Sequence, residues 1–426
     1  MPENTTEHGQ SRTDPFVEPG HTGYTLVYDA ADLVVGPADA DSPNRLRRIE
    51  GGALVVADGR VVAVGDTADV TREYPAENAD TAVDASGKAV TPGFVDPHTH
   101  ALFAGDRSDE FARKLRGESY QEILAGGGGI LKTVRAVRDA STEELAANLT
   151  EHLDRMLAFG TTTVEVKSGY GLDTETELRM LDAIDSAAGA HPVDVVPTFM
   201  GAHAVPEGTD ADDYVDAVVE EQLPAVAEQG VAEFCDVFCD EGAFTAAQSR
   251  RVLEAGVERG LTPKIHAEEF ARIGGSEVGA DVGAASADHL LNATDEDAAA
   301  LAEAGVTPVL LPGTAFGLGA DYADPSLFDE PAIASDFNPN CYARSMGFAA
   351  TLACVGMGMT PEDALVAATR NAARAVDRDD GLGTLQPGAP GDCLVLDAPS
   401  FVHVPYEFGE STVETVVKNG GVVYER

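Results

Sequence analysis

A chain of 426 residues is long enough for one large barrel with a smaller attached domain, or for three small domains. Its 73 acidic residues against 28 basic ones give a formal net charge of -45, and only six of the basic residues are lysines. Such a charge repels nucleic acid and anionic membranes, which excludes both as expected partners. Acid-rich, lysine-poor composition resembles that of halophilic proteins, because concentrated salt screens the self-repulsion. A surface that binds cationic partners is the alternative.

The cysteine content and the hydropathy indicate a cytoplasmic protein. Five cysteines are an odd number spread over the whole length, which is not the pattern of a disulfide framework. No charged segment followed by an apolar one opens the chain, as a secretory signal would require. No apolar run approaches the ~20 residues of a membrane helix. Cys235 and Cys239, in FCDVFC, are interpreted as part of a strand and not as a zinc-thiolate pair.

Both ends of the chain show the short apolar runs and turn signals of β structure. Residues 1–22 are polar and lack periodicity, so a disordered tail is expected there. In residues 23–90, two valine-rich runs flank Asp58-Gly59, which predicts a hairpin. The same texture returns in residues 385–426, with a second hairpin turn at Asn419-Gly420. We expect the two ends to form one composite, β-sandwich-like domain.

The middle of the chain, residues 91–384, alternates apolar strand-like runs with helical stretches rich in alanine and glutamate. Repeated βα units predict an α/β fold with a parallel sheet. Eight strands can be counted, so a closed (β/α)8 TIM barrel is the economical interpretation. The predicted strand segments are GFVDPHTH, TTTVEVKSGYG, VDVVPTFMGAH, AEFCDVFCD, PKIHAEEF, SADHL, TPVLLPG and AIASDFNP.

Polar residues follow these strands at the ends where a TIM barrel gathers its active site. His98 and His100 are two residues apart on the first strand, so their imidazoles face the same side. His266 ends the fifth strand and Asp336 the eighth. Three imidazoles and one carboxylate suit zinc, and iron nearly as well, and a bound metal lowers the pKa of its water to ~7. Each histidine alone has a hydrogen-bonded loop residue as its alternative, but together they predict a hydrolase's metal site.

This order of ligands, completed by His289 on the sixth strand, resembles the amidohydrolase superfamily. There a second metal usually needs a carboxylated lysine or another bridging group at the end of the fourth strand, and the predicted fourth strand has no lysine. The resemblance therefore implies one zinc or iron ion, with Lys167 of the second strand as a structural cation. His289 then stays free to accept the proton of the attacking water. A fifth metal ligand is the alternative role for His289.

Several longer strings resemble one branch of that superfamily, the imidazolonepropionase family of histidine degradation. They extend over most of the predicted barrel. The strings are HTHALFAGDRSDEF, LRGESYQEILAGGGGILKTVRAVRDAS, VEVKSGYGLDTETELRML, TFMGAHAVPEGT, CDVFCDEGAFT and KIHAEEF. The resemblance implies hydrolysis of the cyclic amide C–N bond of 4-imidazolone-5-propanoate to N-formimidoyl-L-glutamate, using zinc or iron. It also implies a small-molecule substrate and a homodimer.

The expected substrate is a planar ring with a propionate tail, which needs a cation and several hydrogen-bonding groups. Arg107 offers a planar fork that can hold the carboxylate. A surface ion pair with Asp106 or Asp109 is the alternative for this arginine. Tyr120 and Tyr170 match family positions that line the substrate site, and core packing is their alternative.

Two further residues are assigned to the ring of the substrate. His203, in MGAHAVP, corresponds to a family residue that contacts the ring. Glu269 lies three residues after His266, so it is predicted to hold a ring N–H and to carry a proton to the leaving nitrogen. Glu268, which faces the other side of the chain, is the less favoured choice. An ion pair within the barrel is the alternative role for Glu269.

After Asp336 the chain departs from the family pattern. The family commonly continues with proline, glycine and a small hydroxyl residue, whereas this chain reads DFNPNCYARS. Asn338 matches the family and is assigned to the glutamate end of the product. Asn340 and Cys341 occupy the next substrate-binding positions. Asparagine tolerates a left-handed backbone, but a thiol is a weak hydrogen-bond partner, so a related substrate stays open.

Two other functions are compatible with parts of this pattern. A deaminase acting on an aminated heterocycle uses a similar ligand set, and release of ammonia would distinguish it. A non-catalytic scaffold would be marked by loss of the metal ligands, and all four are present.

Overall fold

The computed structural model describes residues 23–38, 46–118, 122–123 and 126–426. The expected disordered tail, residues 1–22, and Tyr120 lie outside these residues. The described chain forms three sheets, of four, six and eight strands. None of its helices combines the length and the hydropathy needed to span a membrane.

The eight-stranded sheet is the predicted barrel. Its strands follow one another in chain order, and all neighbours are parallel. The strands are β8 (Phe94–Asp96), β9 (Thr161–Lys167), β10 (Asp194–Ala202), β11 (Phe234–Cys239), β12 (Thr262–Ala267), β13 (Ser286–His289), β14 (Thr307–Leu310) and β15 (Ala332–Ile333). Seven of them lie within a predicted segment, and β12 begins one residue before its own, at Thr262. The match confirms the (β/α)8 fold, and FCDVFC is confirmed as a strand.

The barrel closes where the first strand meets the last, just beyond the ends of β8 and β15. Thr99 and Phe337 form a parallel bridge. The His100 N–H donates to Phe337 O at 2.9 Å, and the Asp336 N–H donates to His98 O at 3.2 Å. Predicted metal ligands therefore lie directly on the seam of the barrel.

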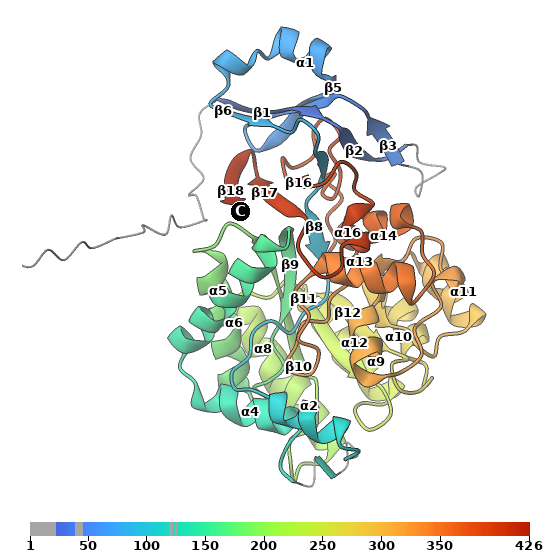
Figure 1. The fold of residues 1–426 in the computed structure, drawn as a ribbon. Coiled ribbons are helices and arrows are strands. Elements are labelled where there is room, and N and C mark those ends of the chain that lie inside the picture. Colours follow the sequence, from blue (N-terminus) through green and yellow to red (C-terminus); the bar gives the residue numbers. More distant parts are fainter. Residues whose placement is uncertain (1–22, 39–45, 119–121, 124–125) are drawn as a thin grey trace, which may run out of the picture.

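Helices surround the barrel strands (Figure 1). Ser141 and Glu144 form a capping box at the start of α5, which satisfies N–H groups that a helix end leaves open. The helices of the barrel part are α2 (Ser108–Leu115), α4 (Ile130–Asp139), α5 (Thr142–Ala158), α6 (Thr174–Ala188), α7 (Ala211–Ala217), α8 (Leu223–Gln229), α9 (Ala246–Val257), α10 (Gly275–Val282), α11 (Asp295–Ala304), α12 (Pro312–Leu318), α13 (Met346–Val355), α14 (Pro361–Ala367) and α15 (Arg370–Ala375).

Strand β9 shows how a fully buried strand divides its side chains between two faces. Its sequence is TTTVEVK, and every residue is buried. Val164 and Val166 belong to the main apolar core, together with Leu149 of α5. Glu165 and Lys167, at the alternate positions, form an ion pair of 2.7 Å. Since side chains alternate between the faces of a strand, the barrel interior receives the charged pair and the helix layer the valines.

The two chain ends form the other two sheets, as expected. Strand β7 from the N-terminal part pairs antiparallel with β16 from the C-terminal part, with Cys393 opposite Pro92. The four-stranded sheet has the order β5-β4-β1-β6, and the six-stranded sheet the order β18-β17-β16-β7-β2-β3. Their strands are β1 (Tyr24–Ala30), β2 (Asp32–Pro37), β3 (Leu46–Ile49), β4 (Gly52–Ala57), β5 (Arg60–Asp66), β6 (Thr81–Asp84), β7 (Ala89–Pro92), β16 (Cys393–Leu396), β17 (Val413–Lys418) and β18 (Gly421–Glu425).

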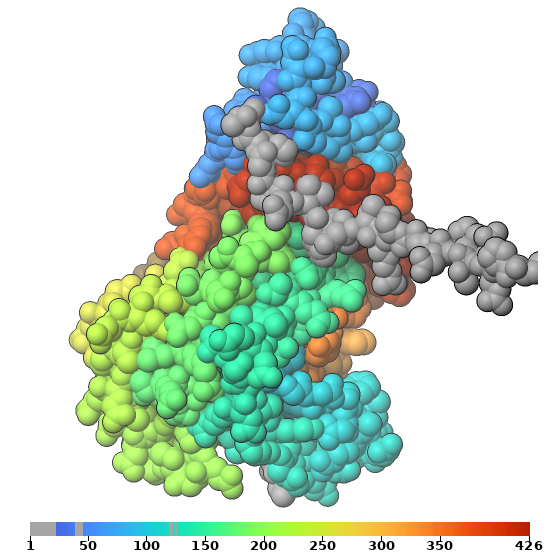
Figure 2. All heavy atoms as spheres, turned by 90° about the vertical axis from the view of Figure 1, so that its left-hand side faces the viewer, coloured from blue at the N-terminus to red at the C-terminus, as the bar shows by residue number. Residues whose placement is uncertain are grey.

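An apolar cluster joins strands of both sheets, among them Val27 of β1, Leu54 of β4 and Val395 of β16. Helix α1 (Thr67–Glu73) covers the four-stranded sheet, and α16 (His403–Tyr406) contacts α13. Figure 2 shows the blue and red segments of the two chain ends stacked over the barrel. The division into folding units at residues 90 and 385 stays a prediction.

Both predicted hairpin turns are confirmed. Asp58 and Gly59 connect β4 and β5 with φ angles of 50° and 74°. Asn419 and Gly420 connect β17 and β18 with φ angles of 51° and 83°. Two consecutive positive φ angles are the geometry of the tight turn that Asp-Gly and Asn-Gly favour.

The functional end of the barrel is the end farthest from the small sheets. Strand β7 ends at Pro92 and β8 begins at Phe94, so the six-stranded sheet meets the amino end of the barrel strands. Helices α2 and α4, which follow β8, lie at the opposite end in Figure 1. Side chains that follow the strands are therefore held away from the small sheets.

Candidate metal centre

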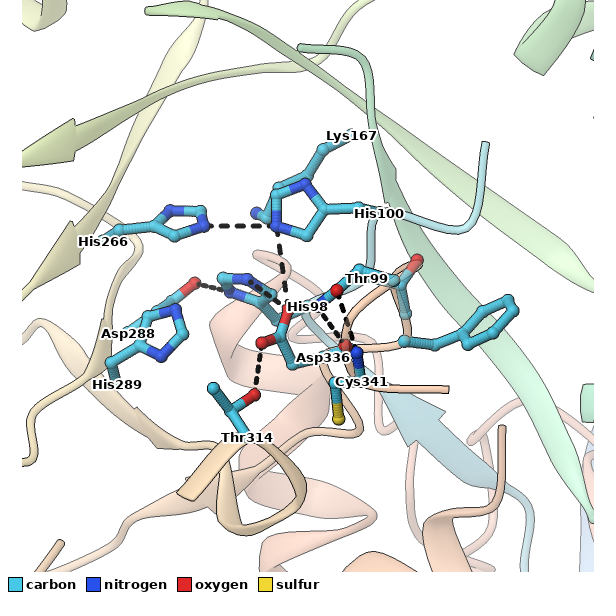
Figure 3. Close-up of polar contacts among 12 residues, drawn as sticks. His98, Thr99, His100, Lys167, His266, Asp288, His289, Thr314, Asp336 and Cys341 are labelled. Atoms are coloured by element: carbon cyan, nitrogen blue, oxygen red, sulfur yellow. Dashed lines mark hydrogen bonds and ion pairs between the residues drawn. The ribbon is translucent and has the colours of Figure 1, made fainter. Parts of the chain in front are cut away.

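The four predicted metal ligands converge at the carboxyl end of the barrel (Figure 3). His98 Nε2 lies 3.6 Å and His100 Nε2 3.7 Å from Asp336 Oδ1. His266 Nε2 lies 3.3 Å from His100 Nε2. All four side chains are buried. His98 and His100 come after the last residue of β8, in the segment that forms the seam, so they belong to the extension of the first strand.

Two ligand atoms of this cluster lack a hydrogen-bond partner. Within the described residues, His98 Nε2 and Asp336 Oδ1 are buried without a hydrogen bond. An unsatisfied buried polar atom costs about 1–3 kcal/mol, so two orphaned acceptors in one cluster of donor atoms indicate a missing ligand. Burial lowers the pKa values of His98 and His100 well below their usual value, which keeps both imidazoles neutral and their lone pairs available. The donor set fits zinc or iron.

Two aspartates behind the histidines determine which ring nitrogen faces the centre. His98 Nδ1 lies 2.6 Å from Asp288 Oδ2, and His266 Nδ1 lies 3.1 Å from Asp236 Oδ1. An imidazole that donates its Nδ1–H to a carboxylate presents Nε2 to a metal. The sequence analysis missed both aspartates. The available signal was an acidic residue inside an apolar strand, in FCDVFC and in SADHL.

Lys167 is a buried structural cation at the end of the second barrel strand, β9. Its Nζ lies 2.7 Å from Glu165 Oε1 and 2.7 Å from Asp236 Oδ2. Burial alone would lower the pKa of Lys167, but Asp236 and Glu165 raise it above the usual value. The ammonium thus balances the carboxylate that orients His266.

Thr314 and Asp336 show the same principle on the eighth strand. The Thr314 hydroxyl, at the start of α12, donates to Asp336 Oδ2 and leaves Oδ1 toward the histidines. Burial raises the pKa of Asp336 to about 6 in the absence of a cation. Thr314 was not predicted, because nothing in its sequence surroundings distinguishes it from a helix residue.

His289 and Glu269 lie side by side at the centre. The distance between His289 Nε2 and Glu269 Oε2 is 3.6 Å. Both ring nitrogens of His289 are buried without a hydrogen-bond partner in the described structure. Ligand atoms of His98, His266 and His289 lie within 4.8 Å of one another, and so do those of His98, His100 and Asp336. His289 is therefore close enough to the other histidines to serve either as the acceptor of the water proton or as a fifth metal ligand.

The neighbouring glutamates have different surroundings. The Glu268 carboxylate accepts the N–H of Ile273 at 2.9 Å and that of Ser276 at 3.0 Å, so it holds the loop before α10. Glu269 faces His289, and burial, followed by Asp336, raises its pKa well above the usual value. Of the two glutamates, Glu269 is the one that faces the centre.

Three residues of the site have left-handed backbone. The φ angles of Glu268, His289 and Asp336 are 55°, 80° and 48°. Residues other than glycine rarely adopt this conformation, and such strain gathers at functional sites. Each of these residues follows or ends a barrel strand, where the chain turns so that a side chain reaches the centre.

His203 and Tyr170 form an aromatic wall beside the predicted ligands. The His203 ring stacks on His100, with ring centroids 4.7 Å apart and an angle of 20°. His203 Nδ1 donates to Gly169 O at 3.0 Å. The Tyr170 ring centroid lies 5.2 Å from that of His203. Burial raises the pKa of Tyr170, so its hydroxyl stays protonated.

Arg107 is bound to a carboxylate other than the two expected alternatives. Its Nε and Nη2 both lie 2.9 Å from Glu110 Oε2, and both side chains are nearly buried. Asp109 binds Lys132 instead, and Asp106 accepts from Ser108. The surface ion pair with either aspartate is therefore absent. Arg107 is the residue directly before α2, and Glu110, in the first turn of that helix, holds its guanidinium.

The loop after Asp336 is organised by Asn338. Its Oδ1 accepts the N–H of Asn340 at 2.7 Å and that of Cys341 at 3.0 Å, and its Nδ2 donates to Asp336 O at 2.8 Å. The Cys341 thiol lies 3.6 Å from Ser335 O and points away from the histidines in Figure 3. The substrate contacts of Asn338, Asn340 and Cys341 stay predictions. The direction of the Cys341 side chain does not favour a contact between its thiol and the substrate.

Models of known families match most of the chain. A model of the amidohydrolase family matches residues 109–424, and one of an imidazolonepropionase-like composite domain of bacteria matches residues 52–76. The second match lies in the small sheets, outside the barrel, so both structural parts resemble known relatives.

Curated relatives match almost the full length. An imidazolonepropionase of Haloarcula marismortui is 68% identical over 402 residues, which cover 93% of this chain and 95% of that protein. One from Halobacterium salinarum is 64% identical over 407 residues, 93% and 97% of the two chains. An adenosine deaminase from Xanthomonas campestris with bound zinc has a TM-score of 0.71 at 18% identity, covering 94% and 93%, a likeness of fold alone. The chain therefore belongs to the amidohydrolase family and, within it, to the imidazolonepropionases.

Proposed function

We propose that the enzyme hydrolyses 4-imidazolone-5-propanoate to N-formimidoyl-L-glutamate, with one zinc or iron ion held by His98, His100, His266 and Asp336. The carrying observation is the set of buried, unpartnered ligand atoms at the barrel end, in a chain 68% identical to an imidazolonepropionase. A metal held there would polarise the ring carbonyl and lower the pKa of a water to ~7. Strand β11, FCDVFC, contains no lysine, which supports one ion over two.

His289 and Glu269 supply the proton transfers. Burial lowers the pKa of His289 well below its usual value, so its neutral ring accepts a proton from the attacking water. The water oxygen bonds to the ring carbonyl carbon, and the C–N bond breaks. Glu269, 3.6 Å from His289, passes the proton to the leaving nitrogen. One water is consumed, and no net proton is gained or lost within the site.

The groups around the centre fit a planar ring with an anionic tail. His203 and Tyr170 provide aromatic faces and hydrogen-bonding atoms for the ring. The Arg107 guanidinium uses Nε and Nη2 for Glu110, so Nη1, which has no partner among the described residues, remains for the propionate. Asn338 and the backbone after it would contact the glutamate end of the product.

The decisive experiment supplies enzymatically generated imidazolone propionate in concentrated salt and follows the decay of its ultraviolet absorbance. Ring opening to the formimidoyl product, without release of ammonia, is the expected result. A folded, metal-loaded protein that leaves the absorbance unchanged would remove this substrate. The variant His289→Ala should keep its metal and lose turnover, and near-normal turnover would exclude His289 as the proton acceptor.

The setting of the enzyme is also a proposal. We infer a cytoplasmic homodimer that acts on a small molecule and does not bind nucleic acid. The net charge of -45 supports the exclusion of nucleic acid and an adaptation to concentrated salt. Size-exclusion chromatography with light scattering, performed in molar potassium chloride, tests the dimer.

A further inference from the structure

Five of the six lysines form an ion pair, as expected in a chain with 73 acidic residues. The pairs are Lys88–Glu414, Lys132–Asp109, Lys167–Glu165, Lys264–Asp288 and Lys418–Asp392. Lys114 is the exception, because no carboxylate of the described residues forms an ion pair with it. This lysine is half-buried on α2, and burial, followed by the charge of Arg107, lowers its pKa.

The contact that Lys114 makes is with a neutral group. Its Nζ donates to Asn340 Oδ1 at 2.5 Å, which joins α2 to the loop after Asp336. An ammonium can only donate hydrogen bonds, so the oxygen of the amide must face Lys114 and its nitrogen must face away. Two N–H groups of Asn340 Nδ2 are thereby directed to the other side. One of the three donors of Lys114 is used by this contact.

Lys114 and Arg107 lie near the two ends of α2. Arg107 is the residue directly before the helix, and Lys114 belongs to its last turn. Glu110, between them, cannot neutralise both cations. Its Oε2 is bound to Arg107, and its Oε1 accepts the N–H of Gly129 at 3.0 Å. These three residues therefore carry one more positive than negative charge, on a protein that is strongly acidic elsewhere.

Each cation is linked to a residue of the site. Arg107 acts electrostatically on Tyr170, whose ring centroid is 5.9 Å from that of His100. Lys114 binds Asn340, which is four residues after the predicted ligand Asp336. Arg107 and Asn340 are both predicted to bind the substrate, so Lys114 contacts the loop that carries one of these residues and follows the other on the chain.

We propose that Lys114 and Arg107 together form the subsite that binds the carboxylate of the substrate's propionate, and that Lys114 also orients Asn340 as a third donor. The inference rests on the proposed function and adds a specificity-determining residue to it. A carboxylate that accepts hydrogen bonds from two cationic side chains is bound more strongly than a carboxylate bound by one guanidinium alone. Loss of one charged donor should therefore weaken binding of the anionic tail and leave the reacting ring unaffected.

The test compares Lys114→Met and Lys114→Arg with the control Lys132→Met. Lys132 lies on α4 and binds Asp109 of α2, and its removal makes the same change in net charge. For Lys114→Met we expect a KM about 10- to 100-fold higher at unchanged kcat, because a charged hydrogen bond to the bound substrate is lost. Lys114→Arg should recover most of the affinity, and Lys132→Met should resemble the unmodified enzyme.

A pair of ligands separates this role from a structural one. Binding of 3-(imidazol-4-yl)propanoate and of its neutral propanamide is measured for each metal-loaded variant. Lys114→Met should weaken the carboxylate about 10- to 100-fold and the amide less than about twofold. Equal weakening of both ligands, no weakening of either, or failure of the unmodified enzyme to bind the carboxylate would each overturn the inference. Lys114→Gln replaces the methionine variant if that does not fold.

The binding measurement is independent of turnover. If imidazolone propionate is not hydrolysed but the carboxylate ligand still depends on Lys114, the substrate assignment fails and the subsite stands. If the substrate is hydrolysed and the carboxylate ligand does not depend on Lys114, the subsite fails and the function stands.

Discussion

Glu268 and Glu269 show how one turn of the backbone separates two chemically identical residues. Both follow β12, but Glu268 has a φ angle of 55° and its carboxylate accepts two backbone N–H groups of the next loop. Glu269 faces His289 instead. Their burial is similar, so composition and burial alone would not distinguish the catalytic candidate from the structural one.

Substitution of each glutamate by glutamine tests this separation. Glu269→Gln should lower kcat about 10²- to 10⁴-fold, the usual contribution of a group that transfers a proton. Glu268→Gln should leave kcat within a few-fold and lower the midpoint of thermal unfolding, because its partners are backbone groups of the fold. Steady-state kinetics and calorimetry on both proteins provide the comparison, and the reverse pattern would exchange the two roles.

Asp236 and Asp288 should control metal affinity without touching the metal. Each accepts a hydrogen bond from the Nδ1 of one histidine ligand. Asp236→Asn and Asp288→Asn should each raise the dissociation constant of zinc about 10- to 100-fold, the typical effect of such supporting groups. Competition with a chelating dye measures it. Asp32→Asn, which alters a buried aspartate bound to Arg48 in the six-stranded sheet, is the matched control and should have no effect.

The sequence predicted the side chains that would bind a metal, but not the aspartates that orient the imidazoles of those side chains. The HxH pair, His266 and Asp336 follow recognisable strands, so their convergence could be inferred from the fold class. Asp236 and Asp288 depend on which strand lies beside which histidine. His98 of the first strand segment meets Asp288 of the sixth strand, and His266 of the fifth strand meets Asp236 of the fourth. These relations are set in three dimensions, and spacing along the chain does not contain them.

Helix α5 supports the metal centre through one histidine. His152 Nδ1 donates to Ala101 O at 2.8 Å, directly after the ligand His100. Its ring also packs against Phe103 and Phe337, with centroids 4.8 Å away in both cases. A neutral imidazole satisfies this contact, because only one of its nitrogens has to donate.

Acidification should destabilise the fold through this histidine, because its buried ring resists protonation. Burial lowers the pKa of His152 below 6.5, so near and below that pH the unfolded chain binds a proton that the folded chain resists. Stability from this group is complete above pH 6.5 and is lost as the pH falls. Urea unfolding at pH 7.5 and pH 5 in constant salt should show a larger loss for the unmodified protein than for His152→Gln. Parallel losses would contradict this linkage.

The sequence predicted the hairpin turns correctly, but it did not predict where the first and last barrel strands end. Asp58-Gly59 and Asn419-Gly420 form the expected hairpins, because the turn geometry is encoded in the two residues themselves. The first and last barrel strands end sooner than their apolar runs suggest, at Asp96 and Ile333. There the backbone leaves the sheet to bring ligands to the centre, a tertiary requirement that overrides local strand preference.

The whole molecule carries its acidic excess outside the barrel core. Exposed acidic side chains repel one another at distances that salt screens, with a Debye length of about 10 Å at 0.1 M and about 3 Å at 1 M. A net charge of -45 should make this repulsion a large part of the stability balance. The pairing of β7 with β16 holds the two chain ends together against this electrostatic repulsion.

Raising potassium chloride from 0.1 M to 1 M should raise the free energy of unfolding, and the electrostatic part of this increase should level off near 1 M. Urea unfolding, which adds no ions, measures the effect. Sucrose at the same osmolality stabilises by exclusion without screening and is the control. Equal stabilisation by salt and sucrose would show that charge repulsion is not the cause.

The seam between the first and last strands has a consequence for the integrity of the barrel. His98 and His100 lie on one side of it and Asp336 on the other, and they are separated by most of the barrel sequence. An ion bound by all three would be a reversible cross-link that reinforces the backbone bridge by which the ring of strands closes. Cross-links between distant positions restrict the unfolded chain most strongly. The bound metal would then stabilise the folded barrel, and depletion of metal would lower the stability of the enzyme as well as its turnover.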